Sequence, residues 1–114
     1  MTLEELCRQI PLEVRTAARK LGAEVTGGYA SDLLSCVMAK AQEGNVWVTL
    51  QSHPNIVAVA SLLNLAGIII TEGIVPGAAT VEKAEQEGIP ILMTELATFT
   101  VVGRLFECGV PGVD

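Results

Sequence analysis

The chain has 114 residues and a formal net charge of −6, and half of its residues are hydrophobic although only 4% are aromatic. This length predicts a single domain with an aliphatic core, and the acidic balance argues against nucleic acid as a partner because an acidic surface repels phosphate. The longest apolar stretch is shorter than the ~20 residues that cross a bilayer, and the chain opens without a signal-peptide pattern, so we expect no membrane contact and a cytoplasmic location.

The N-terminal residues predict a short helix followed by an ambiguous segment. Thr2 suits an N-cap, and the apolar spacing behind it indicates a helix that Pro11 ends. Residues 12–21 contain good helix formers, yet their alternation of apolar and polar positions fits a short strand equally well. The pattern alone leaves both interpretations open.

A second helix is expected after an extended, glycine-containing segment. Residues 23–30 predict an extended stretch with a kink or bulge at Gly27–Gly28. Ser31 or Asp32 is then placed to cap an amphipathic helix over residues 33–43. Its single apolar stripe is typical of a helix packed on a sheet.

The middle of the chain predicts a βαβ unit. Residues 46–50 form a β-branched and aromatic run typical of a buried strand, Pro54 suits a first helical turn, and residues 68–70 are three isoleucines. The intervening residues 55–66 are apolar on nearly every side and stop at Gly67. Two strands joined by a crossover helix imply parallel pairing and a right-handed connection.

The remaining residues repeat the alternation of helix and strand. Thr80 is expected to cap a helix that Gly88 ends, residues 89–94 predict a short buried strand, and Thr98 is expected to cap the last helix. Residues 110–114 are expected to form a loose tail. The chain therefore predicts an α/β fold, with a single domain whose mainly parallel sheet and flanking helices are built from βαβ units.

The helix expected over residues 55–66 has apolar side chains on all sides, among them Ile56, Leu62 and Leu65. A helix of this kind must be buried all round. One cover is a second subunit in a two-fold homodimer. The alternative is a central helix enclosed within a monomer.

No motif of a familiar enzyme class or metal site is present. The chain lacks a P-loop, a G-x-G-x-x-G after a strand and a G-x-S-x-G nucleophile turn. The single histidine, His53, cannot build a His-rich metal site, and the odd set of Cys7, Cys36 and Cys108 lacks metal-ligand spacing. We therefore expect no catalytic or metal-binding residues, no cofactor, and three buried thiols in a reducing compartment.

Polar residues follow the ends of the expected strands, where open α/β sheets bind ligands. His53 lies between a strand and a helix N-terminus, whose backbone N–H groups favour an anion. Each of these residues also has a structural alternative, as a helix cap or as the exit from a strand. The candidate ligand contacts are first Thr49, Ser52, His53 and Asn55, then Thr71 and Gly73, and also Asp32.

Several longer stretches carry a family resemblance. They are Val25–Tyr29, Ser31–Ser35, Trp47–Gln51, His53, Asn55, Val57–Ser61, Ile89–Leu92, Thr98–Phe99 and Gly103–Leu105. Together they resemble the DRTGG domain, a family that is similar to the N-terminal domain of HPr kinase/phosphorylase. The likeness is to its short stand-alone members and runs from about Leu3 to Gly109.

The resemblance implies a fold, a role and a partner. It implies that residues 12–16 form the first strand, and that the domain is regulatory, without catalytic activity and often dimeric. The stand-alone kind is often encoded near iron-only hydrogenase components, which implies a partner enzyme of redox or energy metabolism. Where the family has Asp-Arg and Thr-Gly-Gly, this chain has Ser52-His53 and Thr71-Glu72-Gly73, so a ligand that needs the Asp-Arg pair would lose its contacts.

We therefore expect a homodimeric, non-catalytic regulatory domain that binds a small anionic metabolite or nucleotide, docks onto a partner enzyme, or does both. One alternative is a pure assembly subunit without a ligand pocket. A second alternative is a small enzyme that uses His53 as a general acid–base, since the ordinary pKa of histidine suits that work.

Overall fold

A five-stranded sheet forms the centre of the computed structural model, which describes residues 1–114. The strand order is β1-β5-β4-β3-β2, and β1 alone runs antiparallel to its neighbour. The strands span Glu13–Val14 (β1), Gly27–Ala30 (β2), Asn45–Thr49 (β3), Gly67–Ile70 (β4) and Ile91–Met93 (β5). The prediction of an α/β domain with a mainly parallel sheet is confirmed, and β1 lies where the family resemblance places the first strand.

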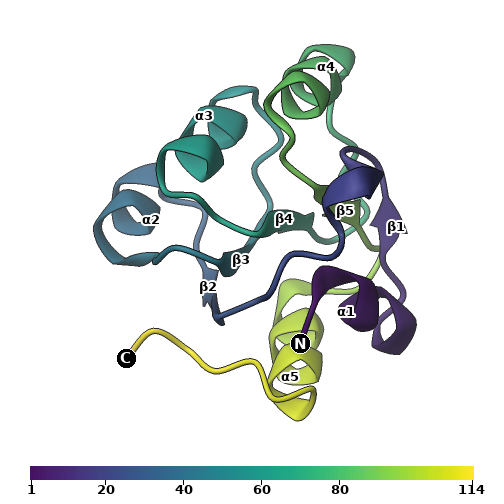
Figure 1. Cartoon of the computed structure of the whole chain (residues 1–114), viewed down its shortest axis with the longest axis vertical. Helices are drawn as coiled ribbons and strands as arrows, with labels where there is room; N and C mark the ends of the chain where they lie inside the picture. Colours follow the sequence, from purple (N-terminus) through teal and green to yellow (C-terminus); the bar gives the residue numbers. More distant parts are fainter.

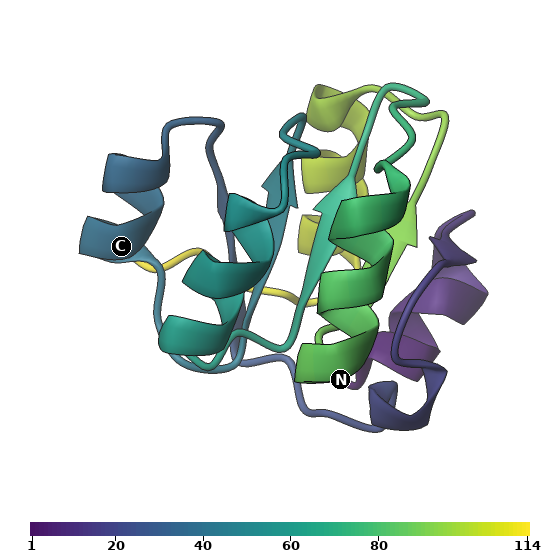
Figure 2. The same cartoon turned by 90° about the horizontal axis from the view of Figure 1, so that it is seen from above.

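Five helices cover the two faces of this sheet. They span Leu3–Gln9 (α1), Leu34–Lys40 (α2), Asn55–Leu62 (α3), Ala78–Glu87 (α4) and Thr98–Glu107 (α5), and a 3₁₀ turn (η1) lies at Ala18–Lys20. The connecting helices α2, α3 and α4 lie on one face, whereas α1 and α5 lie on the other (Figure 1, Figure 2). Since β2 to β5 follow one another across the sheet in a single direction, right-handed crossovers place all three connecting helices on the same side. None of the helices has both the length and the apolar composition needed to cross a bilayer.

The central strands are buried on both faces because helices cover each face. Successive side chains of a strand point to opposite sides. Trp47 and Ile68 pack with α2, α3 and α4, whereas Val48 and Ile69 pack with α1 and α5. Trp47 and Ile68 are also direct neighbours in the parallel register of β3 and β4. Burial on both sides explains why these strands are continuous apolar runs in the sequence.

Helix α3 is largely enclosed by its own chain. Ile56, Val57 and Val59 are buried between the sheet and the neighbouring helices, whereas Leu62 is 67% exposed. The helix also ends at Leu62, before the expected stop at Gly67. A single chain therefore leaves one side of α3 exposed at Leu62, and its cover by a second subunit stays a prediction.

Several predicted helix caps are replaced by other arrangements. Helix α4 begins at Ala78 and α5 begins at Thr98 itself, so neither Thr80 nor Thr98 is an N-cap. Asp32 does not cap α2, because its carboxylate is bonded to the loop after β3. The predicted cap at Thr2 is confirmed, and it forms a reciprocal capping box at the start of α1.

The C-terminal segment lies against the edge strand β2. The predicted bulge at Gly27–Gly28 is absent, since β2 pairs with β3 in continuous register. Instead, the missing side chains let another stretch of backbone approach: the Gly28 N–H donates to the Pro111 carbonyl at 2.8 Å, and a Cβ on Gly27 would lie 3.0 Å from that oxygen. Val110 is buried, so Val110 and Pro111 belong to the packed domain rather than to a loose tail.

Candidate functional site

The predicted ligand contacts lie along the carboxyl edge of the parallel strands. Asp32 follows β2, Thr49 ends β3 and Thr71 follows β4. The parallel register of the strands brings these positions to one edge of the sheet. Their side chains nevertheless divide into separate sets of hydrogen bonds and do not converge on one cavity.

The first set joins the loop after β2 to the loop after β3. One carboxylate oxygen of Asp32 accepts from the Thr49 hydroxyl at 2.9 Å and from the Leu50 N–H at 2.7 Å. The Gln51 side chain donates to the Asp32 carbonyl at 3.0 Å, and the Gln51 N–H donates to the Thr49 hydroxyl at 3.1 Å. The Thr49 hydroxyl is thus used as both donor and acceptor, which leaves it little capacity for a ligand.

The second set closes the N-terminus of α3. The exposed His53 accepts the Asn55 N–H on its ring Nδ1 at 3.2 Å. The Ile56 N–H donates to the His53 carbonyl and the Val57 N–H donates to the Pro54 carbonyl, each at 3.1 Å. An incoming anion would therefore find the first N–H groups of this helix already bonded. This geometry corresponds to the capping role that the sequence leaves open for His53.

The third set ties the loop before α3 to α4. The buried Thr80 hydroxyl donates to the backbone carbonyl of Ser52 at 2.7 Å. The side chains of Ser52 and Asn55 make no hydrogen bond within the chain. Among the first-choice candidates, these two side chains and the Nε2 atom of His53 remain free for a ligand.

The turn after β4 holds the beginning of α5. The hydroxyls of Thr71 and Thr98 share a hydrogen bond of 2.6 Å, and a carboxylate oxygen of Glu72 accepts the Thr98 N–H at 3.1 Å. Glu72 and Gly73 both adopt left-handed φ angles, 62° and 72°, and the Gly73 N–H donates to the Thr94 carbonyl. The sequence gives no sign of the Thr71–Thr98 pair, because the two residues are far apart along the chain. The segment Thr71-Glu72-Gly73 therefore holds the N-terminus of α5 in place through hydrogen bonds.

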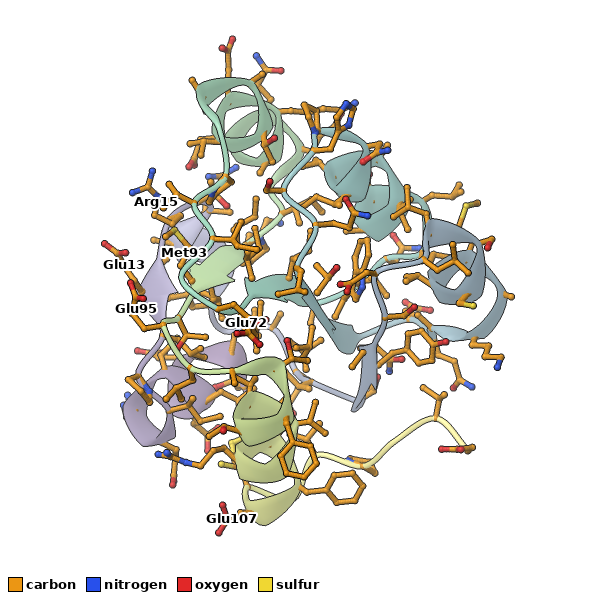
Figure 3. All side chains as sticks on the ribbon, turned by 180° about the vertical axis from the view of Figure 1, so that it is seen from behind. Glu13, Arg15, Glu72, Met93, Glu95 and Glu107 are labelled. Atoms are coloured by element: carbon orange, nitrogen blue, oxygen red, sulfur yellow. The ribbon has the colours of Figure 1, made fainter.

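An open hollow of about 360 Å³ lies beside this turn, between β5, β1 and α1. Gly73 is the only predicted ligand contact that lines it, and its charged lining residues are Glu13 and Glu95, which lie close together (Figure 3). Cys7 also lines it, and burial, with a smaller effect of the nearby Glu4, raises the pKa of this thiol. All three cysteines are half-buried rather than buried. The negative charge of the hollow does not suit an anionic ligand.

Membership of a family follows from a comparison with known domains. A model of the DRTGG domain matches residues 17–108. The chain belongs to the DRTGG domain family.

This DRTGG domain shares its fold with the regulatory region of a Clostridium perfringens pyrophosphatase, whose structure contains CBS and DRTGG domains complexed with an activator, diadenosine tetraphosphate. The similarity has a TM-score of 0.72 at 18% sequence identity, and it covers 96% of this chain and 47% of that one. The DRTGG domain described here thus spans about half the length of that structure. No curated protein matches the sequence.

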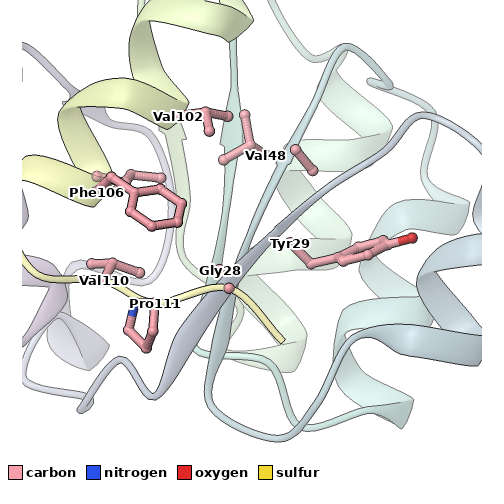
Figure 4. A pocket seen from close by; sticks show the side chains of 10 residues that line it. Gly28, Tyr29, Val48, Val102, Phe106, Val110 and Pro111 are labelled. Carbon is pink, nitrogen blue, oxygen red and sulfur yellow. The ribbon is translucent and has the colours of Figure 1, made fainter. Parts of the chain in front are cut away.

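A small apolar hollow of about 60 Å³ lies at the other edge of the sheet, between β2, α5 and the C-terminal segment. Val102 and Phe106 line it from α5, and Val110 and Pro111 line it from the C-terminal segment (Figure 4). The ring of Tyr29 points away from it and packs on the other face of the sheet. Sequence reasoning finds the apolar stripe of α5 but not the hollow, which depends on the position of the C-terminal segment.

The two phenylalanines of this DRTGG domain are both exposed on α5. Phe99 is 91% exposed and Phe106 is 64% exposed, whereas Val101 and Leu105 on the opposite side of the helix are buried. The core is thus mostly aliphatic, with Trp47 as its fully buried aromatic side chain, whereas both phenylalanines lie on the surface. Large apolar side chains gathered on one exposed face are typical of an interaction surface.

Proposed function

We propose that this chain is a cytoplasmic, non-catalytic regulatory domain that acts as a homodimer and docks onto a metabolic partner enzyme. The observation that carries the homodimer is a contrast between two parts of the surface. Hydrogen bonds within the chain occupy most of the polar groups at the carboxyl edge of the sheet, whereas the aromatic side chains of α5 are exposed and suit contact with another protein surface. Membership of the DRTGG family, and a fold shared with the regulatory region of an enzyme, support the regulatory role.

The geometry around His53 argues against catalysis. A general base needs an orienting partner and a nearby group whose proton it moves. Here the Nδ1 atom of His53 is bonded to the helix backbone, and no carboxylate or nucleophilic side chain is hydrogen-bonded to the ring. His53 is therefore better suited to hold α3 than to transfer a proton.

A nucleotide or another small anionic metabolite is the second candidate, as a ligand that would regulate the docking. The observation in its favour is the free side chains of Ser52 and Asn55 beside His53, and the related pyrophosphatase region, complexed with a dinucleotide activator, suggests which class of ligand to test first. None of the candidate contacts is Lys or Arg, and Asp32 adds a carboxylate at the same edge. Docking is therefore the primary proposal.

The partner enzyme is proposed from the family resemblance. The family resemblance points to redox or energy metabolism, with iron-only hydrogenase components as the first candidates. Three free thiols are consistent with a reducing compartment. Co-purification of tagged chain with such an enzyme, and a change in the enzyme's activity when the chain is added, would support the proposal.

A thermal-shift experiment separates docking from ligand sensing. ATP, ADP and diadenosine tetraphosphate would be tested against the intact chain and against His53→Ala. A ligand present at a hundredfold excess over its Kd stabilises a binding protein by about 2.7 kcal/mol. A docking module gives no shift with any of the three, and a sensor gives a shift that His53→Ala removes. Turnover of any of these compounds would contradict the non-catalytic assignment.

A further inference from the structure

We propose that the α5 face, formed by Phe99, Val102, Gly103 and Phe106, is a two-fold docking surface for a second copy of this chain. In this arrangement Phe99 of each copy enters the apolar hollow beside Phe106 of the other copy. The inference rests on the proposed homodimer and names the surface through which the homodimer forms.

The exposed area of the α5 face is large enough to contribute much of a stable interface. A phenylalanine side chain offers roughly 200 Å², so the exposed fractions of Phe99 and Phe106 together leave roughly 300 Å² of aromatic surface in water. A standard interface buries roughly 800 Å² on each partner. These two rings supply more than a third of that area before Val102 and the neighbouring Pro111 are included.

The size of the apolar hollow indicates what it accommodates. Pockets for small molecules usually enclose roughly 300–1,000 Å³, whereas this hollow has about 60 Å³. Its lining is mostly apolar, with Val102, Leu105, Phe106 and Val110 as its main side chains. A single apolar side chain from another protein surface is therefore a better occupant than a metabolite.

The spacing of the α5 face favours a second copy over an unrelated partner. Phe99 and Phe106 are seven residues apart, so they lie on one side of the helix about 10 Å apart along its axis. A two-fold axis that passes between Val102 and Gly103 therefore brings Phe99 of each copy next to Phe106 of the other. A surface that carries both a protruding ring and a hollow at this spacing is self-complementary, as a two-fold interface requires.

Gly103 and the local charge both permit close approach of two copies. A Cβ added to Gly103 would meet nothing within 4 Å, so the helix surface is bare at the point where the two α5 helices would cross. The chain contains 13 acidic residues, yet none lies between residues 98 and 106. The one cation in that stretch, Arg104, donates to the Gln9 carbonyl of its own chain at 3.0 Å. Two copies can therefore meet here without burying like charges.

Three variants test this surface by light scattering and sedimentation over a range of concentrations. Phe99→Glu replaces a ring that makes almost no contact in the monomer by a charged side chain. Gly103→Gln adds a side chain at the bare crossing point of the two helices. Leu62→Glu is the matched control, because Leu62 has a similar exposure to Phe106 but lies on α3. We expect a wild-type particle of twice 12.0 kDa, a rise of at least tenfold in the dimer dissociation constant for Phe99→Glu and Gly103→Gln, and no change for Leu62→Glu. Thermal unfolding of each variant verifies that the monomer stays folded.

The outcomes separate this inference from the proposed function. A wild-type dimer that persists in Phe99→Glu, or that Leu62→Glu breaks, overturns the α5 surface and leaves the homodimer standing. A wild-type chain that is monomeric at every concentration overturns both the homodimer and the α5 surface. As a direct measurement, p-benzoylphenylalanine in place of Phe99 should cross-link to the Phe106–Val110 segment of a second copy, and cross-links confined to other segments would overturn the arrangement.

Discussion

The Thr16 hydroxyl accepts a hydrogen bond from the Ile91 N–H at 2.8 Å and donates one to the Ile89 carbonyl at 2.7 Å. Thr16 is 2% exposed. Its buried hydroxyl takes the place of a backbone group in the hydrogen bonding between neighbouring strands. It continues the pairing of the two-residue strand β1 with β5 beyond Val14. The short antiparallel edge of the sheet is thereby attached to the parallel strands.

Replacing Thr16 by Val should destabilise the fold, because the shape is kept but a buried N–H and a buried carbonyl lose their partner. The expected loss in the free energy of unfolding is about 1–3 kcal/mol, measured by urea denaturation. Thr100→Val is the matched control, since Thr100 is exposed and its hydroxyl makes no bond in the chain; it should change stability by less than about 0.5 kcal/mol. Equal effects of the two variants would contradict the assigned role of Thr16.

Replacing His53 tests whether this residue is a cap or a ligand contact. His53→Ala removes the acceptor of the Asn55 N–H and should lower stability by about 1 kcal/mol, the usual effect of losing a helix cap. His53→Asn keeps a side-chain acceptor in reach and should recover most of the loss. If His53→Ala retains full stability in the absence of any ligand, the capping account is wrong.

The sequence predicts those features whose causes are local. The β-branched runs around Trp47 and Ile69 specify parallel buried strands, and the apolar spacing of α1 together with Thr2 specifies its capping box. The roles of Asp32 and Thr98 were not predictable in this way, because their hydrogen-bond partners come from other strands and helices. A polar residue ahead of a helix has the pattern of a cap whether or not a distant group takes its hydrogen bond.

The side of α5 that faces the core is also not predictable from the local sequence, because it depends on packing. Its sequence contains two apolar stripes, one with Phe99 and Phe106 and one with Val101 and Leu105. Nothing in the pattern decides which stripe meets the sheet, and hydrophobicity alone would favour burying the aromatic one. The structure buries the smaller aliphatic side chains under β3 and the C-terminal segment. The choice depends on the shape of the sheet face, which the sequence of α5 does not contain.

Replacing Gly44 by Ala should be strongly destabilising. Gly44 has a φ of 81°, where a non-glycine residue costs roughly 1–2 kcal/mol, and an added Cβ would lie 2.6 Å from a side-chain carbon of Thr26. We expect a loss of at least about 2 kcal/mol in the free energy of unfolding when both effects act. Gly22→Ala is the control, because its Cβ would meet nothing within 4 Å and it should be neutral or stabilising by up to about 1 kcal/mol. Similar losses of stability for Gly44→Ala and Gly22→Ala would contradict the role assigned to the Thr26 contact.

The acid sensitivity of the fold should depend in part on Glu85, which ties α4 to the 3₁₀ turn. Its carboxylate accepts the Ala17 N–H at 3.0 Å and the Arg19 guanidinium at 2.7 Å, and these bonds, that from Ala17 first, lower the pKa of Glu85 below its ordinary value. A carboxylate of this kind stabilises the fold above its unfolded pKa of about 4.3, and the contribution is lost as the pH falls through the lower, folded value.

Glu85→Gln should therefore be less stable than wild type in urea at pH 7, and the difference should shrink below about pH 4. Glu82→Gln, on the same helix but without a side-chain bond, should follow the wild-type pH profile. A difference between Glu85→Gln and wild type that stays constant down to pH 3 would mean that the charge of Glu85 does not act in this way.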